Sequence, residues 1–176
     1  MRIRFAAAAL IAVASMGCAT LNVRSYAERG AAFTRYHTYT WGPADELTTG
    51  DPRLDANPFF HGRIQADVEQ RLAARGFEKV QSGSADLTVH YHANLRQRVD
   101  VGGVDRGFGY CDADECRPYV SEAGTVTIDL VDARTRRLVW RGWVEGTLDG
   151  VVDNQSWMER KIDDAVARIV DTIPRQ

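Results

Sequence analysis

The fold is decided by the stretch LTVHYHANLR, residues 87–96, in which apolar and polar side chains alternate without a break. Strict alternation has the period of a β-strand, whose successive side chains point to opposite faces. It predicts a strand over residues 86–99 with one buried face and one polar face. The buried face would carry Leu87, Val89, Tyr91, Ala93 and Leu95, and the polar face Thr88, His90, His92, Asn94 and Arg96.

Further strands are predicted on both sides of this stretch. Residues 123–132 repeat the alternation, and after a turn at residues 133–136 a returning strand follows at residues 137–147. On that returning strand we expect one face to carry Leu138, Trp140 and Val144. Shorter strands are expected at residues 21–26, 36–41 and 77–80.

Two amphipathic helices are predicted. The first spans residues 58–75, because Asn57-Pro58 is a typical helix start and Gly76 a typical helix end. The second begins near Asn154 and stops before Pro174. Their apolar stripes consist of Phe60, Ile64, Val68 and Leu72 in the first helix, and of Met158, Ile162, Ala165, Val166 and Ile169 in the second.

These elements predict one α+β domain with two layers. A mostly antiparallel sheet of about 5–6 strands would carry both amphipathic helices on one face. The other face of the sheet would then meet water or a partner. No internal repeat and no second domain is visible in the sequence.

The N-terminus has the pattern of an export signal. Two arginines within residues 1–4 precede an apolar run at residues 5–16. As a helix this run would span about 18 Å, at ~1.5 Å per residue, and the hydrocarbon core of a bilayer is about 30 Å thick. The run therefore predicts targeting rather than a transmembrane anchor.

Ser15-Met16-Gly17-Cys18 resembles the lipobox of bacterial lipoproteins, although Ser15 stands where that pattern usually has Leu. The resemblance implies a signal peptide at residues 1–17, lipidation of Cys18, for example with palmitate, and an exported domain at residues 18–176. Ala19 follows the cysteine where inner-membrane retention signals have Asp, which implies sorting to the outer membrane. The alternative is ordinary secretion with cleavage after a nearby small residue.

Charge argues against a nucleic-acid partner, since 22 Lys and Arg face 24 Asp and Glu. The predicted mature chain of 159 residues loses two arginines and carries −4, so its attachment to an anionic membrane would rest on acyl chains. Strand character begins about two residues after Cys18, which would hold the fold within roughly 10 Å of the bilayer, at ~3.6 Å per extended residue.

Residues 100–121 are rich in glycine and lack periodicity, which predicts a long functional or mobile loop. Cys111 and Cys116 lie in it, and in an exported protein such a pair most simply forms a disulfide. The alternative is a metal site in which both thiolates act with Asp112, Asp114 or Glu115. No second ligand pair accompanies them, so we expect no metal.

The candidate face for a partner or ligand consists of His90, His92, Asp129, Arg141 and Trp143, which alternation places on the polar side of the sheet. Two histidines are an incomplete metal site, and a solvated polar face is the alternative. Motifs of nucleophilic, zinc-dependent, phosphate-binding and dinucleotide-binding enzymes are missing from the sequence. We therefore predict no catalytic residue and no cofactor.

Seven short motifs occur in order and resemble the bacterial envelope lipoprotein family catalogued as DUF4136, a domain of unknown function. They are NVR (22–24), YTWGP (39–43), DPRL (51–54), RGF (75–77), ADLTVHY (85–91), GTVTIDL (124–130) and LVWRG (138–142). The resemblance implies an exported, usually lipid-anchored α/β domain of Gram-negative bacteria, and it brings no catalytic residue.

The expected function is therefore a non-enzymatic binding or structural module at the periplasmic face of the outer membrane. It would meet an envelope protein through the open sheet face, an edge strand or the loop at residues 100–121. One alternative is a carrier of a small apolar ligand or lipid, which a deep apolar cavity would favour. Another is an uncharacterised hydrolase on the polar face.

Overall fold

A computed structural model describes residues 21–43, 49, 51–81, 83, 85–100, 119–148 and 150–175. The predictions made for the signal peptide, for Cys18 and for the pair Cys111 and Cys116 lie outside these residues. Within them, no helix combines the length and the apolar character needed to cross a bilayer.

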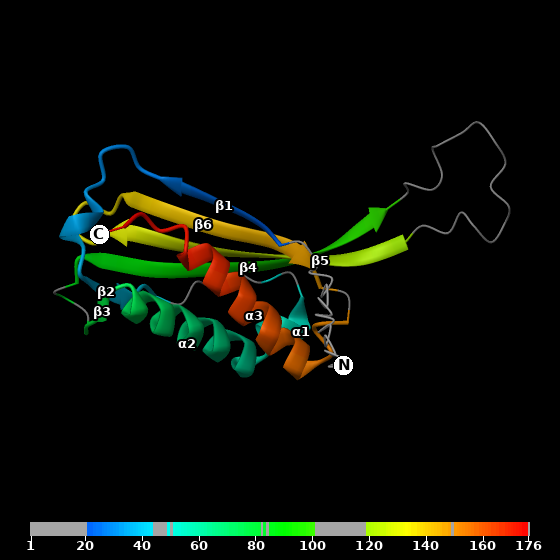
Figure 1. Ribbon diagram of the computed structural model, residues 1–176. Coiled ribbons are helices and arrows are strands. Elements are labelled where there is room, and N and C mark those ends of the chain that lie inside the picture. Colours follow the sequence, from blue (N-terminus) through cyan, green and yellow to red (C-terminus); the bar gives the residue numbers. More distant parts are fainter. Residues whose placement is uncertain are drawn as a thin grey trace, which may run out of the picture.

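Six strands form one sheet in the order β1-β6-β5-β4-β2-β3 (Figure 1). The strands are β1 (Asn22–Ala27), β2 (Thr38–Trp41), β3 (Glu78–Lys79), β4 (Leu87–Asp100), β5 (Tyr119–Asp132) and β6 (Leu138–Thr147). β1, β6, β5 and β4 pair antiparallel, whereas β2 pairs parallel with both β4 and β3. The predicted mostly antiparallel sheet is confirmed.

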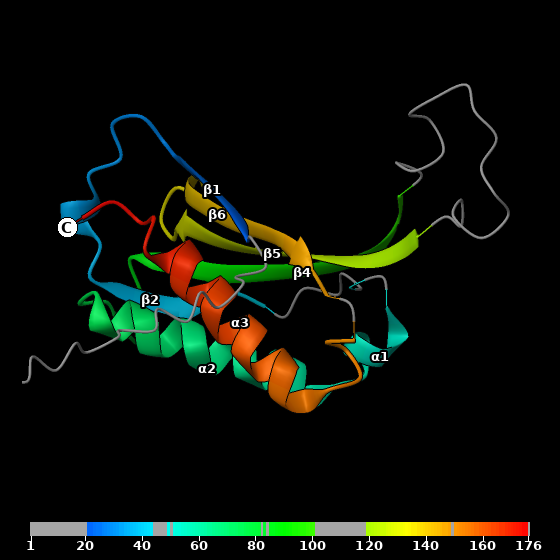
Figure 2. The same ribbon diagram turned by 45° about the vertical axis from the view of Figure 1, so that its right-hand side comes forward.

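Two long helices, α2 (Pro58–Ala74) and α3 (Gln155–Val170), lie on the same face of the sheet (Figures 1 and 2). Both begin where their capping residues predict, because the Asn57 side chain accepts hydrogen bonds from the amides of Phe59 and Phe60 and Asn154 accepts one from Trp157. A short helix, α1 (Pro52–Asp55), and a 3-10 turn, η1 (Phe33–Arg35), were not predicted. The α+β fold class is confirmed.

β4 and β5 pair at every position over their whole length, from Leu87 opposite Asp132 to Asp100 opposite Tyr119. β6 pairs with β5 only as far as Ala123, so the last part of the β4–β5 ladder projects beyond the sheet as a two-stranded arm (Figure 1). The ladder thus extends into the segment predicted as a loop at residues 100–121. The loop prediction was too long at its C-terminal end because β5 begins at Tyr119.

One face prediction on β6 was wrong. Val139 and Trp140 are both buried, whereas Leu138 is only partly buried. A register shift between Leu130 and Val131 places an extra β6 residue in the ladder, and such a bulge breaks the alternation of faces. Trp140 and Val144 lie in the core as predicted.

Gly142 lies close to the ring of Trp140 in the core. A Cβ atom at residue 142 would lie 2.5 Å from two ring carbons of Trp140 and 2.7 Å from Cγ2 of Ile169 on α3. Trp140 is fully buried and Ile169 is too, so neither side chain has free space to move into. Glycine is therefore required here to let the sheet and helix meet.

Gly142→Ala is expected to lower the free energy of unfolding by about 2 kcal/mol, because overpacking a filled core forces its neighbours to shift. Urea denaturation followed by circular dichroism measures the change. Gly62→Ala is the matched control, since residue 62 is exposed on α2 and a Cβ there meets nothing within 4 Å. The control is expected to gain about 0.5–1 kcal/mol from helix propensity. Equal effects of the two substitutions would contradict the packing argument.

Candidate functional site

The face of the sheet that turns away from α2 and α3 carries the five predicted residues. Antiparallel pairing aligns His90 with Asp129 and Asp129 with Arg141 in one row across β4, β5 and β6. The next row aligns His92, Thr127 and Trp143, and continues to Arg24 on β1. The structure therefore brings all five together in two neighbouring rows, and adds Arg24, which sequence reasoning did not single out.

Asp129 and Arg141 form the fixed centre of this face. Arg141 donates from Nε and from Nη2 to the two carboxylate oxygens of Asp129, each at 2.6 Å. The side chain of Asp129 is only 7% exposed, while that of Arg141 is 45% exposed. The hydrogen bond to Asp129 raises the pKa of the Arg141 guanidinium. The two-pronged geometry holds the arginine in one orientation while leaving one side of it open to a partner.

The two histidines flank this pair. Nε2 of His92 lies 3.6 Å from Oδ2 of Asp129. The ring of His90 lies against Gly42, since a Cβ at residue 42 would come within 2.1 Å of its Cε1 atom. In the described part of the chain, no group of three His, Cys, Asp or Glu side chains is arranged to hold a metal ion.

A cavity of about 270 Å³, lined by both polar and apolar side chains, opens where β2 ends beside β4. Its lining includes Trp41, Gly42, Thr49, His61, Gln65, His90, Tyr91 and His92. His61 Nδ1 lies 2.6 Å from the Tyr91 hydroxyl, and burial raises the pKa of Tyr91. Alternation had assigned Tyr91 to the buried face, opposite the histidines. Side chains from both faces of β4 line this cavity because β2 ends at Trp41. Beyond that point the edge of β4 has no neighbouring β2 residue and is open on both faces.

A second, apolar cavity of about 60 Å³ lies between the sheet and the starts of α2 and α3. Residues that line it include Leu21, Leu54, Phe60, Leu148, Val151, Val152, Met158 and Ile162. A cavity on the order of 150 Å³ holds one benzene molecule. The apolar space here is therefore smaller than a lipid chain or a typical small ligand requires.

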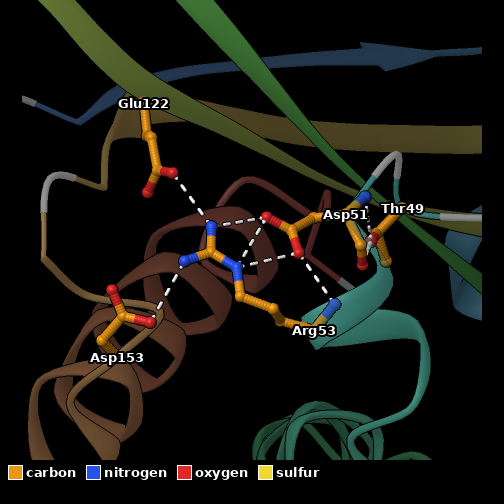
Figure 3. Close-up of polar contacts among 5 residues, drawn as sticks. All are labelled: Thr49, Asp51, Arg53, Glu122 and Asp153. Atoms are coloured by element: carbon orange, nitrogen blue, oxygen red, sulfur yellow. Dashed lines mark hydrogen bonds and ion pairs between the residues drawn. The ribbon is translucent and has the colours of Figure 1, made fainter.

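Three carboxylates surround Arg53 in a cluster of ion pairs (Figure 3). Arg53 on α1 binds Asp51 at 2.6 Å, Glu122 on β5 at 2.9 Å and Asp153 at 3.1 Å. Hydrogen bonding to Arg53 lowers the pKa of Asp51, which also caps α1. The cluster joins α1, the base of the arm and the connection to α3. Its acids are paired with Arg53, so they form a structural clamp rather than an acid-base site.

Comparisons with known proteins agree with this fold. A family model described as "Domain of unknown function (DUF4136)" matches residues 23–175. A comparison with curated proteins finds no match to the chain.

Among solved structures, a PelC dodecamer from Paraburkholderia phytofirmans is similar over 89% of this chain and 100% of its own, with a TM-score of 0.51 and 13% identity. A PDZ domain protein from Parabacteroides distasonis is similar over 89% of this chain and 36% of its own, with a TM-score of 0.59 and 12% identity. A DUF4136 family protein from Bacteroides thetaiotaomicron is similar over 84% of this chain and 95% of its own, with a TM-score of 0.45 and 13% identity. The first two show the fold alone.

Proposed function

We propose that this chain, which belongs to the DUF4136 family, is a lipid-anchored envelope lipoprotein that acts as a non-enzymatic binding or structural module at the periplasmic face of the outer membrane. The sequence supports the location through its signal-like N-terminus and the cysteine at residue 18. The sheet supports the mode of action, because one of its faces is left uncovered by the helices (Figure 2). The anchor would present that face to a partner in the same compartment.

The observation that carries the binding role is the organisation of the uncovered face. A buried carboxylate, Asp129, holds Arg141 in place, and the half-buried Trp143 lies one row away beside Arg24. Arginine and tryptophan are enriched among the residues that dominate protein interfaces, particularly where they are held rigid before binding. A face with prearranged arginine and aromatic groups fits an envelope protein with acidic and apolar surface groups.

The described residues favour this role over the two alternatives. The apolar cavity of about 60 Å³ is too small for a lipid-carrying function. Asp129, the carboxylate nearest to His92, is engaged by two hydrogen bonds from Arg141, which opposes its use as a general base. A second copy of this chain is the first alternative partner to test, since the PelC neighbour is a dodecamer.

Photo-crosslinking in cells tests the role. A photoreactive amino acid at Thr127, on the uncovered face, is expected to capture one envelope protein reproducibly. The same group at Gln70, exposed on α2, is the matched control and is expected to capture none. If the probe captures a second copy of this chain, the partner is the chain itself and not another envelope protein. Equal capture at both positions would contradict a dedicated binding face.

Mass spectrometry of the mature N-terminus tests the anchor. An acylated Cys18 at the first position is the expected result. An unmodified terminus downstream of Cys18 would overturn the lipoprotein part of the proposal while leaving the binding face intact.

A further inference from the structure

The described chain enters the domain at one end of the sheet. Leu21 precedes β1, whose first residue, Asn22, pairs with Glu145 near the end of β6. The Leu21 side chain lies on Gly146, where a Cβ atom would come within 2.3 Å of its Cδ2. Leu21 is therefore packed onto the end of the sheet and fixes the point from which any preceding residues depart.

Further apolar groups gather at this entry end. Val151 and Val152, in the connection from β6 to α3, line the same small apolar cavity as Leu21. Trp157, in the first turns of α3, is 49% exposed and lies against Gly150. Among the described residues, the only large hydrophobic side chains with comparable exposure are Trp157 and Tyr26. We call Leu21, Val152 and Trp157 the entry-end surface.

A basic side chain beside the entry-end surface is suited to a lipid headgroup region. Lys161 lies one helical turn after Trp157 and lines the apolar cavity, so its aliphatic stem can cover apolar atoms while its ammonium group reaches water or phosphate. Tryptophan itself is enriched at membrane interfaces, where its ring is apolar and its N–H remains wet.

The distance to the proposed anchor is short. Leu21 is the third residue after Cys18, so a fully extended chain between them reaches about 11 Å, at ~3.6 Å per residue. An acylated Cys18 would lie at the membrane surface, so the entry end cannot stand further from the lipid than this. Tyr26 lies five residues after Leu21 on β1, about 16 Å further along the strand at ~3.3 Å per residue.

We propose that the entry-end surface of Leu21, Val152 and Trp157 contacts the lipid headgroups of the membrane that holds the N-terminal anchor. This inference rests on the proposed lipidation of Cys18. Contact at this end orients β1 away from the bilayer and leaves the face with Arg141 and Trp143 in water beside it. The domain then stands on the membrane in one orientation instead of swinging on its tether.

Depth-dependent quenching tests this orientation. The full chain, purified from membranes and reconstituted in vesicles of phosphatidylethanolamine and phosphatidylglycerol, carries a fluorescent amino acid at residue 157 or at residue 26. Doxyl-labelled lipids are expected to quench the probe at 157 at least threefold more strongly than the probe at 26. The two native aromatic residues have nearly equal exposure, 49% and 51%, so position 26 is the matched control.

Mass spectrometry on the same preparation separates two kinds of failure. An acylated Cys18 with equal quenching at both positions overturns the entry-end surface and leaves the proposed anchor standing. An unmodified N-terminus without association of the protein with vesicles overturns the anchor and this inference together. An acylated Cys18 with strong quenching at 157 alone supports both.

Discussion

Asp86→Ala is expected to lower the free energy of unfolding by about 3 kcal/mol at pH 7. One carboxylate oxygen of Asp86, Oδ2, accepts hydrogen bonds from the amides of His37 and Thr38, both at 2.9 Å, and from the Thr38 hydroxyl at 3.0 Å. Each hydrogen bond to a charged group contributes about 1.5–3 kcal/mol, and partial exposure reduces that sum. The loss would release the start of β2 from β4, because these bonds join the two strands at that point.

Urea denaturation with an unchanged m-value measures this loss. Asp86→Asn is the matched control, since it keeps an oxygen acceptor but no charge, and about half of the loss is expected. A loss below about 1 kcal/mol for Asp86→Ala would contradict the role given to these hydrogen bonds.

The hydrogen bonds to Asp86 and Asp132 also determine how stability is expected to depend on pH. The amide hydrogen bond from His37 lowers the pKa of Asp86, and amide hydrogen bonding from Thr135 does the same for Asp132. A lowered folded-state pKa contributes stability above the unfolded value of about 3.9, and this stability is lost as the pH falls through the folded value. Below about pH 4 the unfolding free energy of the wild type is thus expected to fall more steeply than that of Asp86→Asn.

Trp143→Ala is expected to reduce capture of the partner by the probe at residue 127 at least tenfold. Trp143 lies directly across from Thr127 on the uncovered face and is half-buried by its neighbours on the sheet. Truncating a tryptophan at the centre of an interface costs about 2 kcal/mol or more, which exceeds a factor of ten in affinity.

Quantitative crosslinking against a Gln70→Ala control measures this effect. The free energy of unfolding of Trp143→Ala is measured in parallel, and a change within about 1.5 kcal/mol would separate lost binding from lost folding. Capture at the level of the control would show that this face is not the binding surface.

Sequence patterns predicted the helices and strand faces that depend on residues close together in the chain. The alternation of residues 87–96 gave the faces of β4 correctly, and Asn57 and Asn154 marked the first residues of α2 and α3. The placement of β2 between β4 and β3 was beyond such rules, since it depends on parallel pairing between segments that are far apart in the chain. The Leu138 error has the same origin, because a bulge depends on how two strands fit together.

In the candidate site, too, local patterns predicted the residues that share one face, but not the contacts between separate elements. His90, His92, Asp129, Arg141 and Trp143 share a face because pleating alone fixes that face. The contact of His61 with Tyr91 and the pairing of Arg53 with Glu122 and Asp153 join separate elements, and no local pattern signals them. Sequence analysis included Arg53 only as part of the DPRL motif at residues 51–54. The predictions for Cys18, Cys111 and Cys116 stay predictions.

The pairing of β1 with β6 sets the order in which this domain assembles. Asn22 and Glu145 are neighbours in the sheet but lie far apart in the sequence, so β1 has no strand to join until β6 is available. Contacts of such long sequence separation slow folding, because a large loop must close before they form. The hairpins β4–β5 and β5–β6 need no such closure and are expected to form first. If the chain is exported N-terminus first and held at Cys18, as proposed above, β1 would be the first strand to leave the membrane and the last to pair.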